Sequence, residues 1–216
     1  MTQTAKRQAA EVLREYGPFL DAEQVHGVTF DGELVWFAAG AHLQSFDPST
    51  GQAGQRLVVS ADAGTAFDGR HFFQLTGEVI QKLDAKSGQV VRTIPAPGKG
   101  KDSGLAWAEG MLWVGQYRDR RILGIDPETG EVRRTIESDR FVTGVTWLQG
   151  ELWHGTFEAD ESELRRVEPA TGEVLERLEM PPDKMISGLE SDGKDAFFCG
   201  GGKSGKVRKV RRPKPG

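Results

Sequence analysis

The chain has a single cysteine, no long apolar run and little that predicts a helix. One cysteine in 216 residues, Cys199, excludes an intramolecular disulfide and favours a reducing compartment. No segment approaches the roughly 20 consecutive apolar residues of a membrane-spanning helix, so we expect no membrane partner. The segment from Met1 to Gly17 is charged throughout and lacks the apolar centre of a signal peptide. These absences together predict a cytoplasmic protein.

Charge is unevenly distributed along the chain. The net charge is −4, yet the stretch from Lys203 to Gly216 has seven Lys or Arg residues and no acid. A basic tail of this kind can contact nucleic acid or anionic surfaces. It lacks the interleaved aromatic residues on which bases stack. We therefore interpret it as a solvated outer strand with a frayed end, and we expect no nucleic-acid partner.

No signature of a bound cofactor stands out. Gly202-Lys203-Ser204 matches the second half of a phosphate-binding loop, but the first glycine of that pattern falls on Phe197. The segment that follows alternates like a strand, whereas a phosphate loop opens a helix. Two histidines with a cysteine or glutamate could bind zinc, yet no local HxH or CxxC pair supports such a site. We expect neither a cofactor nor a metal.

Glycine, in contrast, is abundant, with 28 residues, and much of it is periodic. Five similar segments, GVTF, GTAF, GLAW, GVTW and GLES, begin 37 to 44 residues apart. We call their first residues the lead glycines: Gly27, Gly64, Gly104, Gly144 and Gly188. An aromatic strand, a turn such as DPETG and a β-branched strand follow each segment. Four short strands per repeat, five times over, predict an all-β, five-bladed β-propeller.

The repeats also predict the domain organisation. We expect one propeller domain over residues 25–212, preceded at residues 1–24 by a short helix and a ring-closing segment. The helix is expected over Ala5 to Tyr16, with Ala9, Val12 and Leu13 on one face. Blade five has no fourth strand of its own, because only three follow Gly188. We expect the segment from Tyr16 to Leu20 to supply it.

The order of these motifs resembles the five-bladed glutamine cyclotransferase family and, more distantly, the streptogramin lyase propellers. Gln74-Leu75-Thr76 is similar to that family's QLTW motif, LWHGTF with VEPATGEV to its blade-four motifs, and FFCGGGKSGKV to its closing motif. The resemblance implies conversion of an N-terminal glutamine to pyroglutamate, a transferase activity. It also implies active-site positions, where this chain differs: the family's glutamate falls on Phe37 and its asparagine on Gly155. Its lysine falls on Gly202 or Lys203, and its glutamine on His26.

Strand alternation singles out other candidate residues. Two residues after the lead glycines, the inner strands carry Thr29, Ala66, Ala106, Thr146 and Glu190. Glu190 is the one charge in this column, and a charge there must be paired or solvated. An aromatic column in the second strands, which includes Trp36, Trp113 and Trp153, is expected to pack between blades. The next column reads Phe37, Gln74, Val114, His154 and Cys199.

Ring closure makes blades four, five and one neighbours, so we expect a site at their channel mouth. His154 is the predicted base, because histidine titrates near neutral pH, and Glu190 its partner or the acid. His26, Gln74, Cys199 and Lys203 are the predicted ligand contacts. Each also has a structural interpretation: Glu190 as a solvated strand end, His154 and Cys199 as core residues.

Two functions remain open on the sequence. The first is a small-molecule or peptide-end binding propeller that acts by acid–base chemistry, as a cyclotransferase or a lyase. The second is a non-catalytic binding module that has kept the fold and lost the site. A monomer and a homodimer are both compatible with the sequence.

Overall fold

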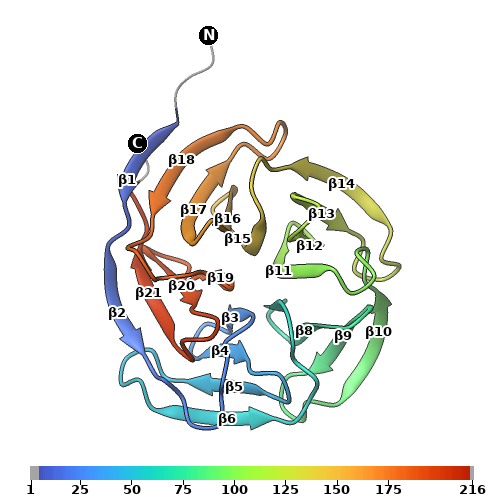
Figure 1. The fold of residues 1–216 in the computed structure, drawn as a ribbon. Helices are drawn as coiled ribbons and strands as arrows, with labels where there is room; N and C mark the ends of the chain where they lie inside the picture. The colour runs from blue at the N-terminus through green and yellow to red at the C-terminus, as the bar shows by residue number, and fades with distance from the viewer. Residues whose placement is uncertain (1–4, 215–216) are drawn as a thin grey trace.

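The structure is a computed structural model that describes residues 5–214. Within this range the chain forms β-strands and no helix, and the strands make five sheets around a central axis (Figure 1). The prediction of an all-β, five-bladed propeller is therefore confirmed. The described residues also lack any helix of the length and apolarity that a bilayer crossing demands.

Each blade follows one glycine-led repeat and runs antiparallel from the axis outwards. Blade one contains β3 (Val28–Phe30), β4 (Val35–Ala38), β5 (Leu43–Phe46) and β6 (Ala53–Leu57). Blade two contains β7 (Thr65–Phe67), β8 (His71–Thr76), β9 (Val79–Asp84) and β10 (Val90–Pro95). Blade three contains β11 (Asp102–Ala108), β12 (Met111–Gln116), β13 (Arg121–Ile125) and β14 (Val132–Glu137).

Blades four and five each receive a strand from the N-terminal segment. Blade four contains β15 (Val142–Leu148), β16 (Glu151–Glu158), β17 (Glu161–Val167), β18 (Val174–Glu179) and, outermost, β1 (Lys6–Ala9). Blade five contains β19 (Gly188–Ser191), β20 (Ala196–Gly200), β21 (Val207–Arg211) and, outermost, β2 (Val12–Tyr16). Both N-terminal strands lie along the rim of the ring in Figure 1.

The expected N-terminal helix is wrong. The N-terminal segment does supply the fourth strand of blade five, as predicted, but that strand lies earlier in the chain than expected. Residues 6–9 pair in parallel with β18, and Val12–Tyr16, rather than Tyr16 to Leu20, pairs antiparallel with β21. A helix of a dozen residues is marginal in isolation. The open edges of β18 and β21 offer hydrogen-bond partners to the backbone groups on one side of these segments. Tertiary pairing therefore overrides the local pattern.

Tyr16 ties the closing strand to the first blade. Its ring lies 4.6 Å from the ring of Phe46 in blade one and 6.5 Å from that of Phe198 in blade five. Its hydroxyl donates a hydrogen bond to the carbonyl of Pro48 at 2.8 Å. Blade five is thus completed, and joined to blade one, by residues from the other end of the sequence.

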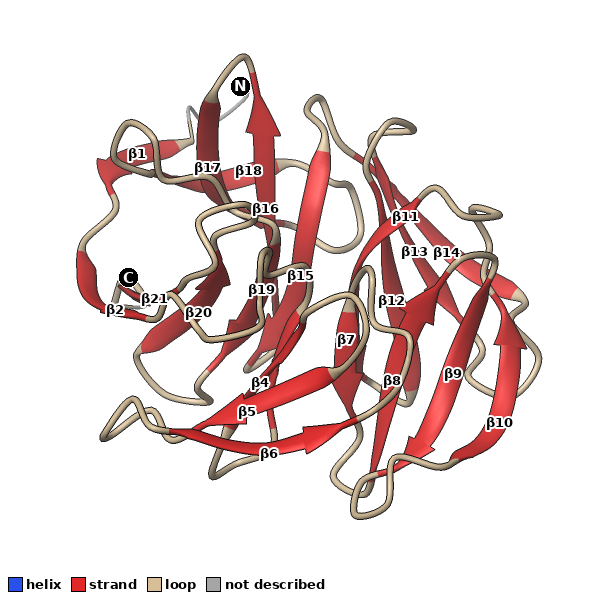
Figure 2. Ribbon diagram, turned by 60° about the horizontal axis from the view of Figure 1, so that its bottom comes forward, coloured by secondary structure: helices blue, strands red, loops and turns tan. Residues whose placement is uncertain are grey.

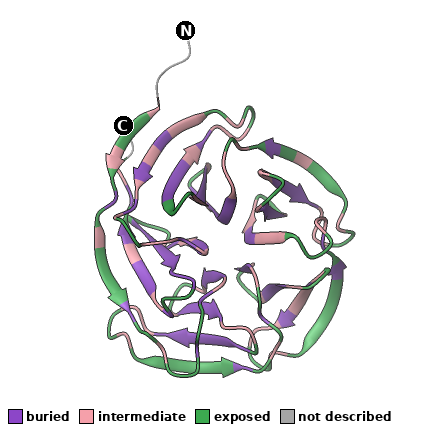
Figure 3. Ribbon diagram, in the orientation of Figure 1, coloured by how far each residue is buried: buried purple, intermediate pink, exposed green. Residues whose placement is uncertain are grey.

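The sides of the blades are apolar and their outer strands are exposed. Figure 3 shows buried residues concentrated in the inner strands, while β6 and β10 are largely exposed along the rim. Rings of the second strands fill the spaces between neighbouring blades: Trp36 lies 4.9 Å from Phe72, and Trp153 lies 4.9 Å from Phe197. The prediction that this aromatic column packs between blades is confirmed.

At the axis, the five inner strands touch at their lead glycines. A Cβ atom on Gly144 would lie 2.3 Å from the backbone nitrogen of Leu189, and one on Gly64 would lie 2.5 Å from that of Leu105. A Cβ atom on each of the remaining lead glycines would lie 2.6–2.7 Å from backbone atoms in or just before the next inner strand. The space that the five enclose leaves no room for a water molecule. The axis is therefore closed at this level, and there is no continuous channel between the described strands.

A side chain at one of these glycines should be highly destabilising. We expect Gly144→Ala to lower the free energy of unfolding by about 3 kcal/mol or more, because the added Cβ meets backbone that cannot rotate away. Urea denaturation monitored by tryptophan fluorescence measures the loss.

Gly110→Asn is the matched control. Gly110 has a φ of +71° and open space around it, and asparagine tolerates positive φ. Its cost should stay within about 1 kcal/mol. Similar losses in the two variants would contradict the close approach at the axis.

Candidate functional site

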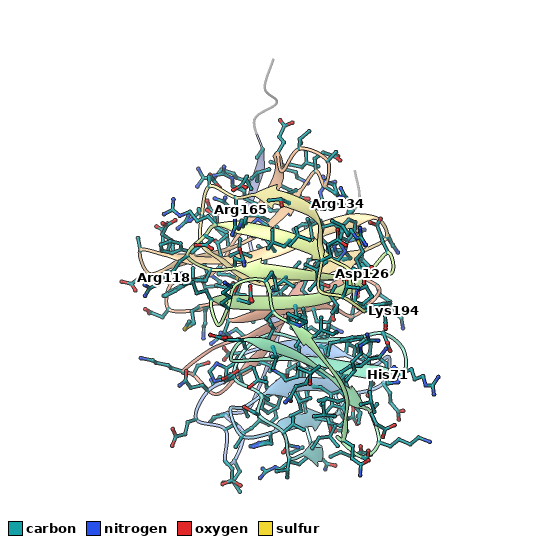
Figure 4. The ribbon with its side chains drawn as sticks, turned by 90° about the vertical axis from the view of Figure 1, so that its right-hand side faces the viewer. His71, Arg118, Asp126, Arg134, Arg165 and Lys194 are labelled. Atoms are coloured by element: carbon teal, nitrogen blue, oxygen red, sulfur yellow. The ribbon has the colours of Figure 1, made fainter. Side chains whose placement is uncertain are left out.

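The propeller has two different ends. At one end, which we call the turn end, each inner strand turns into the second strand, as at Asp31 to Leu34 in blade one. At the opposite end the chain enters the inner strands, and there His26 donates its backbone N–H to the carbonyl of Ala38 at 2.9 Å. Figure 4 shows the two ends from the side, with His71 and Lys194 at the turn end and Arg118 at the other.

A cavity of about 680 Å³ opens at the turn end. Its walls include the residue three positions after each lead glycine: Phe30, Phe67, Trp107, Trp147 and Ser191. Rings of the second strands hold these side chains in place. The Trp107 ring stacks on Phe73 with centroids 5.6 Å apart, and Trp147 lies 4.8 Å from Trp113. Figure 2 shows, in a tilted view, that strands and connecting loops make up the whole described chain.

Glu190 lies between this aromatic layer and the glycine ring. It is the one member of its column with a charge, and it lines the cavity. Its Oε1 atom accepts hydrogen bonds from the Thr146 hydroxyl at 2.5 Å and from the Ser191 backbone N–H at 2.8 Å. Its Oε2 atom accepts one from the Thr29 hydroxyl at 3.0 Å. Strands from blades one, four and five therefore hold the carboxyl group jointly.

Burial changes the acidity of Glu190. Desolvation raises the pKa of this carboxyl group to about 7, against the opposing effect of the hydrogen bonds from Thr146, Ser191 and Thr29. All of these donors are uncharged. Glu190 therefore exchanges its proton near neutral pH, and it can act as an acid or as a base towards a molecule in the cavity.

The charged residues around the cavity are mostly acidic and already hydrogen-bonded. The lining contains four carboxylates, those of Asp31, Glu190, Asp192 and Asp195, and two ammonium groups, those of Lys194 and Lys209. Lys209 lies 3.2 Å from an oxygen of Asp192. Asp31 accepts hydrogen bonds from the Trp36 indole at 2.6 Å and the Leu34 backbone N–H at 2.7 Å. Because four carboxyl groups and two ammonium groups line it, the cavity favours cations over anions when these groups are ionised.

His154, the predicted base, lies inside blade four and does not line this cavity. Its side chain is 1% exposed, and its Nδ1 atom lies 3.3 Å from the carbonyl oxygen of Gly155. Burial, together with the nearby Arg165, lowers the pKa of His154 to about 4, so the imidazole is neutral at pH 7. Cys199 is fully buried as well, and desolvation raises the pKa of its thiol to about 12. It therefore stays protonated and is a poor nucleophile.

The three remaining predicted contacts also lie away from the cavity. Gln74 is fully buried, and its amide donates to the carbonyls of Ala63 and Leu75. His26 is half-buried at the opposite end, where burial lowers the pKa of its imidazole. Lys203 is exposed and follows Gly202, which pairs with Val25 at that same end. Of the six predicted site residues, all within the described part of the chain, Glu190 is the one that lines the cavity.

The positions implied by the cyclotransferase resemblance do not line the turn-end cavity either. Phe37 is fully buried against Phe19 and Phe46. A Cβ on Gly155 would lie 2.7 Å from side-chain atoms of Ile186 and Thr143, so a larger residue does not fit there without rearrangement. The expected convergence of Glu190 with the other candidates therefore does not occur at this cavity.

The sequence contained a second signal that identifies the cavity. Three residues after the lead glycine, four blades carry an aromatic residue and blade five carries Ser191. Blade five thus departs from the repeat at two consecutive positions, Glu190 and Ser191. The first places a carboxyl group among small residues, and the second removes a ring from the wall. Reading both columns together would have placed the candidate site at the turn end.

Comparison with known proteins establishes the fold. No family profile matches the sequence, and no curated protein matches it. Among solved structures, the glutaminyl cyclase of Myxococcus xanthus has a TM-score of 0.79 at 17% identity, over 96% of this chain and 97% of that one. The WD40 propeller domain of Doa1 has a TM-score of 0.55 at 17% identity, over 87% of this chain and 63% of that one. A chain of the mitotic checkpoint complex has a TM-score of 0.53 at 15% identity, over 88% and 62%.

Stability should depend on pH through Glu190. In the unfolded chain this residue titrates near its ordinary value, whereas the folded protein keeps the proton up to about pH 7. Between about pH 4.5 and pH 7 the folded state therefore binds more protons, and its stability falls as the pH rises. Across this pH range we expect the free energy of unfolding of wild type to fall by on the order of 2 kcal/mol relative to that of Glu190→Gln.

Urea denaturation of the two proteins at half-unit steps from pH 4.5 to 8.5 measures this difference. The Glu78→Gln variant, which neutralises an exposed carboxylate outside the cavity, controls for general charge effects. If the stabilities of wild type and Glu190→Gln stay parallel over the whole range, Glu190 does not titrate as the structure indicates.

Proposed function

We propose that this protein is a ligand-binding propeller that takes a small molecule or a peptide end into the turn-end cavity, with Glu190 as the ionisable contact. The observation that carries this proposal is the Glu190 carboxyl group, held by Thr29 and Thr146 below an aromatic wall in a cavity of about 680 Å³. Like many small-molecule sites, the cavity combines aromatic walls with polar groups held in fixed positions, although its rim carries more charged residues than is usual.

Acid–base chemistry is a second candidate function, favoured by the pKa of Glu190 near 7. A group that is half-protonated at the working pH transfers protons in either direction. We assign this role to Glu190 and not to His154. His154 is buried at 1% exposure, and its lowered pKa leaves it neutral and weakly basic. In this proposal the protein is cyclotransferase-like in fold and divergent in its site.

The likeness to glutaminyl cyclase supports the fold, whereas the residues at the family's active-site positions argue against that activity. Phe37 and Gly155 stand at the positions of the family's glutamate and asparagine, and neither can exchange a proton. A non-catalytic binding module therefore remains the alternative, and the cavity serves it equally well.

An assay of pyroglutamate formation tests whether the protein shares the activity of the glutaminyl cyclases as well as their fold. We expect a glutaminyl peptide to cyclise no faster with the protein than without it, because Phe37 replaces the required acid. Loss of ammonia, followed by mass spectrometry at pH 6 to 8, measures the rate. A large acceleration would show that a proton-transfer group other than the family's glutamate serves the same reaction, and the divergent-site argument would fail.

Occupation of the cavity tests the binding side. In a screen of small cationic, neutral and anionic compounds, we expect hits to shift the indole N–H signals of Trp107 and Trp147 in NMR spectra. Ser191→Phe restores the ring that the other four blades carry at this position and should abolish these shifts by occupying the space beside Glu190.

Lys203→Ala, at the opposite end, is the control and should leave binding unchanged. Thermal melting verifies that both variants fold. The proposal fails if no compound of any charge moves the two indole signals, or if Ser191→Phe folds and binds the hits as wild type does.

A further inference from the structure

We propose that the ligand of the turn-end cavity carries a primary ammonium group, which pairs with the Glu190 carboxylate while its apolar part packs against the aromatic wall. This inference rests on the proposed function, since it names the chemical class of ligand for the same cavity. It follows from the hydrogen bonds of Glu190, the charges that face it and the residues around it.

The first argument is the missing counter-charge. Glu190 is half-buried, and a carboxylate withdrawn from water in this way loses solvation that a counter-charge would replace. The donors to Glu190 are two hydroxyls and one backbone N–H, which stabilise the ionised form only in part. Lys209, the lining cation on β21, is paired with Asp192 at 3.2 Å. A positive charge on the ligand would supply the counter-charge that the protein does not place beside Glu190.

The second argument is the free capacity of one oxygen. Oε1 of Glu190 already accepts two hydrogen bonds, from Thr146 and Ser191, whereas Oε2 accepts one, from Thr29. An ionised carboxylate has about four acceptor sites in total, so Oε2 can accept at least one more hydrogen bond. An ammonium group donates through any of its three N–H bonds. The resulting contact is charge-assisted and stronger than one from a neutral alcohol.

The third argument is the aromatic wall. Phe30, Phe67, Trp107 and Trp147 surround the cavity on four of the five blades. The faces of aromatic rings carry partial negative charge, which attracts a cation. The same rings bury an alkyl or aryl group attached to the ammonium. A hydrophilic cation without such a group would leave that surface unused.

The surrounding charges reinforce the selection. The other titratable and charged groups that line the cavity with Glu190 are Asp31, Asp192, Asp195, Lys194 and Lys209. Thr29, Ala66, Ala106 and Thr146 of the neighbouring inner strands are uncharged. With Glu190 ionised, acids outnumber bases around the cavity. An anionic ligand therefore meets net repulsion, and an ammonium ion meets net attraction.

The test compares three compounds with the same branched chain: 3-methylbutan-1-amine, 3-methylbutan-1-ol and 3-methylbutanoate. At pH 8 we expect the amine to bind at least tenfold more tightly than the alcohol, and the carboxylate to bind most weakly. Glu190→Gln should weaken the amine at least tenfold and leave the alcohol within twofold. Glu78→Gln, the matched neutralisation of an exposed carboxylate, should leave all three unchanged.

Proton release gives an independent readout. The amine stays charged up to about pH 10, so a change in its affinity between pH 5.5 and pH 8 reports on the protein. Affinity should fall as the pH drops and Glu190 takes up its proton. Calorimetry near pH 7 in two buffers of different ionisation enthalpy should detect a proton released by wild type on binding, and none released by Glu190→Gln.

The outcomes separate the two proposals. Equal binding of amine and alcohol, or amine binding that Glu190→Gln leaves intact, overturns the ammonium proposal while the cavity remains a binding site. Stronger binding of the carboxylate overturns it as well. If none of the three binds but other compounds shift Trp107 and Trp147, the ammonium proposal alone fails. If no compound does so, the proposed function fails with it.

Discussion

Backbone contact among five glycines is the constraint on which the rest of this structure depends. Each inner strand approaches the next so closely that an added Cβ atom would collide with backbone. A Cβ on Gly144, for example, would lie 2.3 Å from the backbone nitrogen of Leu189. This contact fixes the distance of every inner strand from the axis, because the rows above and below it follow from strand geometry. Small residues fit in the next layer, and aromatic residues fit where the blades diverge. The cavity lies on the turn-end side of the glycine ring, where the aromatic residues of the inner strands line it.

Blade five uses this framework differently from the other four. Its inner strand places Glu190 in the layer of small residues and Ser191 in the layer of rings. A carboxyl group in that layer is poorly solvated, and its pKa rises accordingly. Ionisation of Glu190 therefore destabilises the folded protein, whereas an alanine at this position, as in blades two and three, has no such effect. Costs of this kind concentrate at functional sites, where selection acts on the chemistry as well as on the fold.

The closure of the ring explains why blade five can support such a site. Its outermost strand comes from Val12–Tyr16, and Tyr16 fastens it to blade one through the Phe46 ring and the Pro48 carbonyl. Blades one and five are thereby joined, and β1 links the same N-terminal segment to blade four. Those same blades supply Thr29, Thr146 and Glu190, so the hydrogen bonds around the carboxyl group depend on closure. The site and the closing strand are parts of one arrangement.

The sequence by itself determined the number of blades, the order of strands within each and the unusual character of Glu190. Turn residues and strand alternation are local, and five copies of one pattern strengthen each other. The N-terminal segment was different. Its apolar spacing is compatible with a helix, and only the folded structure provides the edges of β18 and β21 on which it forms strands instead. His154 and Cys199 shared a column with Gln74, yet the column faces the interior of the blades. Which face of a strand meets solvent, and which end of the axis opens, depends on how the blades pack. Only the tertiary structure decided those two questions, because burial is a property of neighbours that lie far apart in the chain.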